Sequence, residues 1–116
     1  MMSRIRSFKF AINGLFSMLR TEHNARVQAL ALTVVVTLGF VYEISPTEWI
    51  AVVVVSGAVM AAEAFNTAIE RLADFVEPQW NEKIGVIKDL CAAAVLLTAV
   101  SAAVVGGIVF IPKILG

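Results

Sequence analysis

The stretch LCAAAVLLTAVSAAVVGGIVFIP, from Leu90 to Pro112, contains no charged residue and decides the fold class. A helix needs roughly 17–25 mostly apolar residues to cross about 30 Å of hydrocarbon, so this stretch is long enough to span a bilayer. The sequence therefore predicts an integral membrane protein with a transmembrane helix over residues 84–113.

The composition of the whole chain agrees with a membrane protein. Its 116 residues are 59% hydrophobic and 16% charged, whereas soluble domains are about 45–50% apolar and about 25% charged. A small soluble domain has too little interior to bury this surplus of apolar side chains. The formal net charge is zero, so electrostatics give no reason to expect a nucleic-acid partner. A single cysteine, Cys91, excludes an intramolecular disulfide.

Two further spans and a surface helix are predicted before this segment. The first span covers residues 25–45 and ends at Ser45 and Pro46, because proline cannot continue a helix. The second covers residues 47–75, and its apolar run is too short to cross alone, so the helix continues into the cytoplasm. Residues 1–24 carry apolar side chains at helical spacing with basic ones between them, which is typical of an amphipathic surface helix. We expect one all-α membrane domain over residues 1–116.

Basic residues predict the orientation of these spans. Cytoplasmic flanks of membrane helices carry an excess of lysine and arginine. The loop over residues 43–48 has none, whereas the N-terminal flank and the connection between spans two and three are basic through Arg4, Arg6, Lys9, Arg20, Arg26, Arg71, Lys83 and Lys88. The sequence therefore predicts a cytoplasmic N-terminus and three crossings.

Polar side chains follow directly on the apolar run of the second predicted span. They are Glu63, Asn66, Thr67, Glu70 and Asp74. At about 100° per residue, these five side chains fall within one stripe about 100° wide on the helix surface. An ionisable residue inside a membrane helix costs at least about 2.5 kcal/mol on insertion scales, so such a stripe indicates a functional site. We expect it to face protein or a water-filled cleft.

Other charged residues are predicted to lie at the same cytoplasmic level as the stripe. Glu22 and Arg26 lie at the entry to the first span, and Lys88 and Asp89 lie near the start of the third. Carboxylates from two helices with a lysine suit a divalent cation and a polyphosphate, because carboxylate oxygens hold Mg²⁺ while lysine balances phosphate charge. The pattern therefore favours phosphate chemistry at the cytoplasmic edge of the membrane.

The run EAFNTAIERLAD, from Glu63 to Asp74, resembles the signature of the prokaryotic diacylglycerol kinase family, small integral-membrane lipid kinases that include undecaprenol kinase. The resemblance extends over nearly the whole chain. It includes residues in the surface helix, at the entry to the first span and before the third span, namely Ser7, Phe8, Ala11, Gly14, Leu15, Thr21, Glu22, Asn24, Lys88 and Asp89.

The resemblance implies a homotrimer in the bacterial cytoplasmic (inner) membrane. Each subunit would use MgATP to phosphorylate the hydroxyl of a lipid alcohol, either diacylglycerol or undecaprenol. Glu63 would be the catalytic base, and Glu22 and Glu70 would hold Mg²⁺. By the same resemblance, four more residues would contact ATP or support its site: Lys88, Asp89, Asn66 and Asp74.

The residues alone leave two other functions open. A small proton- or cation-coupled transporter could use Glu63 as its ion site, since that function also predicts a buried carboxylate. The transporter hypothesis gives no role to Glu22, Lys88 and Asp89 on one side of the membrane. A structural or pore-forming membrane protein would not need the stripe at all. The choice between the two lipid alcohols also stays open, because each presents apolar tails and one primary hydroxyl.

Overall fold

The computed structural model describes the backbone of residues 2–116 and the side chains of residues 3–116. Over this range it contains four helices, which are α1 (Met2–Thr21), α2 (His23–Val41), α3 (Pro46–Val76) and α4 (Glu82–Leu115). The predicted all-α class is confirmed. By length and composition, α2, α3 and α4 can each cross a membrane.

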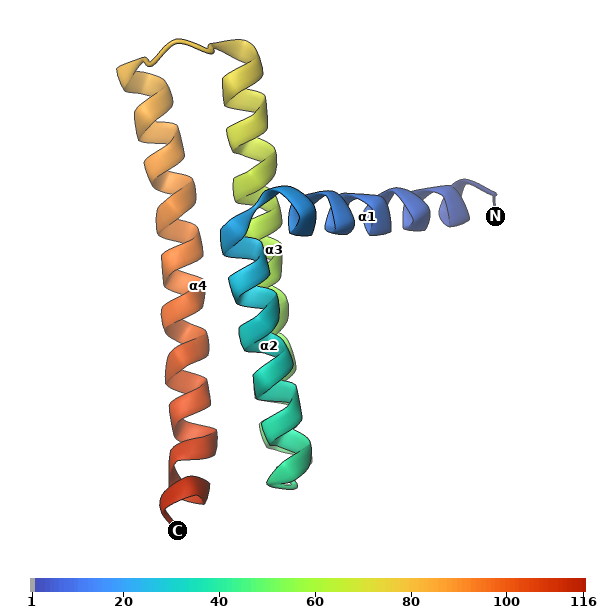
Figure 1. Ribbon diagram of the computed structural model, residues 1–116, viewed down its shortest axis with the longest axis vertical. Coiled ribbons are helices and arrows are strands. Elements are labelled where there is room, and N and C mark those ends of the chain that lie inside the picture. The colour runs from blue at the N-terminus through green and yellow to red at the C-terminus, as the bar shows by residue number, and fades with distance from the viewer. Residues whose placement is uncertain (1) are drawn as a thin grey trace.

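The α3 helix is central, because it contacts each of the other three helices. Figure 1 shows α3 and α4 as a long antiparallel hairpin with α2 alongside α3. The α1 helix points away from this bundle and across its length, and α3 and α4 continue beyond the level at which α1 leaves (Figure 1). The second predicted span therefore does continue past the junction between α1 and α2.

The turn between α2 and α3 differs from the predicted boundary. The α2 helix ends at Val41, and the chain reverses through Glu43, whose φ of 50° lies in the left-handed region. Ser45 and Pro46, which the sequence indicated as the end of a span, instead begin α3. Proline suits the first helical position because its missing N–H would have no partner there.

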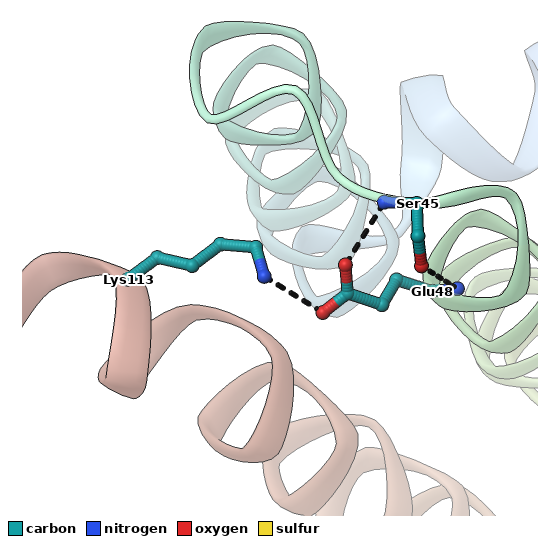
Figure 2. A network of polar contacts seen from close by, with 3 residues as sticks. All are labelled: Ser45, Glu48 and Lys113. Atoms are coloured by element: carbon teal, nitrogen blue, oxygen red, sulfur yellow. Dashed lines mark hydrogen bonds and ion pairs between the residues drawn. The ribbon is translucent and has the colours of Figure 1, made fainter. Parts of the chain in front are cut away.

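Side-chain caps at the start of α3 fix this end of the helix. The Ser45 hydroxyl accepts a hydrogen bond from the backbone N–H of Glu48 at 3.2 Å, and the Glu48 carboxylate accepts one from the Ser45 N–H at 2.9 Å. This reciprocal arrangement is a capping box. The second oxygen of Glu48 pairs with Nζ of Lys113 at 2.8 Å, which joins the start of α3 to the end of α4 (Figure 2).

The best-packed part of the subunit lies beside these caps. Ile44, Val52, Val109 and Phe110 form a buried cluster there, against which Trp49 packs. Elsewhere many apolar side chains are exposed; Phe65 and Ile108, for example, are each 70% exposed. A single chain therefore buries few of its apolar side chains, as expected when lipid or another protein covers the rest.

Candidate functional site

The polar stripe of α3 is partly buried within one subunit. Glu63 is 1% exposed and Thr67 is 4% exposed, while Asn66 and Glu70 are half-buried. Oε1 of Glu63, Oδ1 of Asn66 and Oγ1 of Thr67 are buried and have no hydrogen-bond partner in the described part of the chain. Each such atom costs about 1–3 kcal/mol when it is left unpaired. Three of them within about one helical turn indicate a place where a polar ligand binds.

The bend between α1 and α2 brings Glu22 to this stripe. Glu22 has extended backbone angles and precedes the first turn of α2, but its side chain makes no capping hydrogen bond. Its carboxylate and that of Glu70 are the two charges close enough to Glu63 to repel it. The charges of Glu22 and Glu70, the two predicted metal ligands, therefore act on the predicted base Glu63 from two different segments of the chain.

The predicted nucleotide contacts lie further along the α3–α4 hairpin. Lys88 of α4 forms an ion pair with Asp74 of α3, with 2.7 Å between Nζ and Oδ1. The charge of Glu70 also reaches Lys88, which connects this pair to the rest of the stripe. Asp89 follows Lys88 but is exposed, and no hydrogen bond or ion pair joins its side chain to residues 3–116. Asp89 is thus a predicted site residue whose side chain is not joined to the rest of the site by any hydrogen bond or ion pair within residues 3–116.

The donor set fits Mg²⁺ held jointly by protein and phosphate. Over residues 2–116, no three His, Cys, Asp or Glu side chains lie close enough together to hold a metal ion by themselves. In nucleotide sites Mg²⁺ usually has only one or two carboxylate ligands, with phosphate oxygens and waters completing its octahedron. Glu22 and Glu70, whose charges both act on Glu63, supply that number of carboxylates.

Two apolar grooves flank the stripe. A groove of about 470 Å³ lies between α1 and α3, and its only polar side chains are Thr67 and Arg71. A second groove, of about 330 Å³, lies between α3 and α4 and includes Asn66. Each groove therefore places one residue of the stripe beside a largely apolar surface, as an amphiphilic ligand would require.

Sequence reasoning missed one contact beside the site. The guanidinium of Arg71 donates hydrogen bonds to Oγ of Ser17 at 3.2 Å and to Oγ1 of Thr21 at 2.6 Å, and so joins α3 to α1. The sequence analysis treated Arg71 only as a basic residue of a cytoplasmic flank. The spacing of Ser17 and Thr21 by four residues was the available signal, since it places both hydroxyls on one face of α1.

Comparison with known proteins identifies the family. The family model for prokaryotic diacylglycerol kinase matches residues 9–110, which include all seven of the predicted site residues. The chain belongs to the prokaryotic diacylglycerol kinase family. The resemblance drawn from the run at residues 63–74 is therefore confirmed, and the chain is placed among prokaryotic lipid kinases of the membrane.

Two curated members of the prokaryotic diacylglycerol kinase family are similar over most of this chain. Undecaprenol kinase of Bacillus subtilis (strain 168) is 33% identical over 109 residues, which are 94% of this chain and 89% of that protein. Diacylglycerol kinase of Synechocystis sp. is 31% identical over 110 residues, which are 94% of this chain and 63% of that protein. The chain thus spans less than two thirds of the second relative. The names of the two relatives differ in the lipid alcohol.

Proposed function

We propose that this protein is an MgATP-dependent kinase that phosphorylates the primary hydroxyl of a membrane lipid alcohol at the cytoplasmic edge of the bilayer. The observation that carries the proposal is the Glu63 carboxylate, which is buried, has an oxygen without a hydrogen-bond partner in the described residues, and lies on a helix that borders two apolar grooves. Membership in a family of lipid kinases supports the same activity.

In this proposal Glu63 is the general base. A primary alcohol is almost fully protonated at neutral pH, so its attack on phosphorus is helped by a group that accepts the proton as the bond forms. Oε1 of Glu63 is available for that proton because it accepts no hydrogen bond in the subunit. The neighbouring Thr67 hydroxyl and Asn66 carbonyl oxygen are available to orient the lipid hydroxyl or the phosphoryl group, and we assign Asn66 a supporting role.

The phosphates of ATP are assigned to the cytoplasmic side of Glu63. Glu22 and Glu70 are the proposed Mg²⁺ ligands, and Mg²⁺ when bound would neutralise charge on the transferring phosphoryl group. The charge of Glu70 acts on Lys88, and we assign the Lys88 ammonium to a phosphate held there. Asp74 orients Lys88 through its 2.7 Å ion pair. Asp89, exposed next to Lys88, is assigned to the nucleotide as well.

Diacylglycerol and undecaprenol both fit this arrangement as substrates. Each has apolar tails that can lie in a groove beside α3 and one primary hydroxyl that can reach the stripe. The match covers 89% of the relative named undecaprenol kinase and 63% of the relative named diacylglycerol kinase. This greater coverage favours undecaprenol as the first substrate to test.

The membrane arrangement completes the proposal. We place the protein in the bacterial cytoplasmic (inner) membrane as a homotrimer, with the N-terminus in the cytoplasm and α1 as an amphipathic helix on the membrane surface. The exposed apolar side chains of α1, such as Phe8 at 69% and Phe16 at 60%, support its contact with lipid. Basic residues on the α1 side and near the α3–α4 connection support the orientation.

A kinase assay tests the proposed function. Purified protein in mixed micelles is incubated with MgATP and with undecaprenol, diacylglycerol or no added lipid, and the phosphorylated lipid is quantified. We expect transfer to at least one lipid alcohol, and we expect Glu63→Gln to lower turnover by about 10²-fold or more while ATP still binds. Glu43→Gln is the matched control, because Glu43 is exposed in the turn between α2 and α3, at the opposite end of the subunit from the stripe.

The same assay separates the kinase from the transporter hypothesis. A transporter that uses Glu63 as its ion site would phosphorylate no lipid, and its Glu63→Gln variant would change ion flux in vesicles instead. Absence of lipid phosphorylation by the unmodified protein would overturn the proposed function. Near-normal turnover in Glu63→Gln would overturn the assignment of the base alone.

A further inference from the structure

Arg71 has a charge that no carboxylate of the subunit neutralises. Its guanidinium donates to two neutral hydroxyls, those of Ser17 and Thr21, and it forms no ion pair with residues 3–116. Arg71 is exposed, and neither Glu70, its neighbour in sequence, nor Asp74, three residues further along the same helix, pairs with it. An arginine has five N–H donors, and two hydroxyls leave several of them available.

Arg71 lies on the same side of α3 as Glu63, the proposed catalytic base. Glu63, Thr67 and Arg71 are spaced by four residues, so they lie on one side of α3 with a rise of about 6 Å between successive members. Thr67 and Arg71 are the only polar side chains that line the groove of about 470 Å³ between α1 and α3. The rest of the lining is small or apolar, as at Gly14, Ala64 and Ala68.

This arrangement selects a ligand with a long apolar part and an anionic end. The groove accepts the tail, and Thr67 and Arg71 supply its polar lining. One helical turn beyond Thr67, the planar guanidinium of Arg71 offers paired donors that match the oxygens of a phosphate. A neutral lipid alcohol would leave those donors and that charge unused.

We propose that Arg71 recognises the phosphate monoester of the phosphorylated lipid in the α1–α3 groove, with Ser17 and Thr21 holding the guanidinium in position. The inference rests on the proposed function, because a phosphorylated lipid is the product of that reaction. Arg71 thereby acts on the product after transfer and makes the reaction sensitive to accumulation of its own product. Arg71 is a binding residue for the product phosphate, and Ser17 and Thr21 are positioning residues.

Thermal stabilisation by added lipid tests this assignment without requiring turnover. The full chain is unfolded in dodecyl maltoside micelles that contain increasing mole fractions of dioleoyl phosphatidate or undecaprenyl phosphate. Diacylglycerol serves as the uncharged control, phosphatidylglycerol as a phosphodiester control and inorganic phosphate as the free-anion control. A ligand that binds only the folded state raises the unfolding temperature, and the rise grows with the ligand concentration relative to its dissociation constant.

We expect at least one lipid phosphate monoester to stabilise the unmodified protein. We expect Arg71→Gln to require at least about tenfold more of that lipid, because the variant loses the charge-assisted hydrogen bonds to the phosphate. Arg20→Gln is the matched control, because Arg20 is exposed on α1 and does not line the groove. The double variant Ser17→Ala, Thr21→Val should stay within about threefold of the unmodified protein, because it keeps the guanidinium.

Four results would overturn the inference. They are an unchanged response in Arg71→Gln, equal stabilisation by phosphatidylglycerol, Arg71-dependent stabilisation by inorganic phosphate alone, and a double variant as weak as Arg71→Gln. The last result would show that Arg71 only ties α1 to α3. Failure of the kinase assay would refute the proposed function separately, because the binding measurement uses neither ATP nor turnover.

Discussion

Glu70 is the residue on which the metal assignment depends most directly, because it is half-buried between Glu63 and Lys88 and its charge reaches both. Replacing it by glutamine keeps the shape of the side chain but removes the anionic oxygens that a hard cation prefers. We expect Glu70→Gln to raise the Mg²⁺ concentration required for half-maximal turnover by about tenfold or more. A Mg²⁺ titration of kinase activity measures this concentration.

The matched control for this variant is Glu82→Gln. Glu82 is an exposed carboxylate in the first turn of α4, near the same end of the hairpin but outside the stripe. Its replacement should leave the Mg²⁺ titration unchanged. If Glu70→Gln shows the Mg²⁺ dependence of the unmodified protein, then Glu70 does not hold the metal.

Gly39 is a residue whose missing side chain determines the packing of α2 against α3. A Cβ atom at this position would lie 2.6 Å from one ring carbon of Trp49 and 2.8 Å from another. Overpacking of this kind typically costs about 1–3 kcal/mol. We therefore expect Gly39→Ala to lower the unfolding temperature in detergent by several degrees.

Gly57→Ala is the internal comparison for this measurement. Apart from the adjoining residues and the nearby backbone of its own helix, no described heavy atom lies within 4 Å of a Cβ built at Gly57, and alanine is the better helix former. The variant should unfold no lower than the unmodified protein. Equal unfolding temperatures for Gly39→Ala and the unmodified protein would show that the Trp49 ring moves aside at little cost.

At the scale of the helices, the start of α3 depends on one hydroxyl. The Ser45 side chain caps the helix by accepting the N–H of Glu48, and the loss of such a cap costs about 0.5–2 kcal/mol. We expect Ser45→Ala to lower the unfolding temperature measurably. Thr47→Ala, an exposed position in the first turn with no cap contact, should have a smaller effect. Similar effects of both variants would mean that Pro46 alone sets the start of the helix.

The same turn shows which features of the helices the sequence predicts. Long charge-free runs identify membrane-spanning helices, because only a helix satisfies its own backbone in lipid. The exact end of α2 was not predictable in this way, since Glu43 adopts a φ of 50° without being glycine or asparagine. Ser45 and Pro46 were interpreted as a stop, although the Ser45–Glu48 spacing is also the signature of a helix start.

At the scale of the whole molecule, the site was predictable along one helix but not across helices. Helical periodicity alone placed the five polar residues of α3 in one stripe. The approach of Glu22 to Glu63 depends on the bend between α1 and α2, and the contact of Arg71 with Thr21 depends on how α1 lies over α3. These contacts join residues about 40 to 50 positions apart, for which periodicity carries no information.

The last prediction concerns the assembly. One subunit buries Glu63 and Thr67, but it leaves Asn66 only half-buried, next to the exposed side chain of Phe65. Polar groups facing hydrocarbon are costly, and a neighbouring subunit that covers the stripe would remove that cost. We expect a homotrimer, so sedimentation equilibrium in density-matched detergent should give three times the chain mass of 12.5 kDa. A measured mass of one chain, for protein that is still fully active, would contradict the prediction. The stripe would then function without any cover from a second chain.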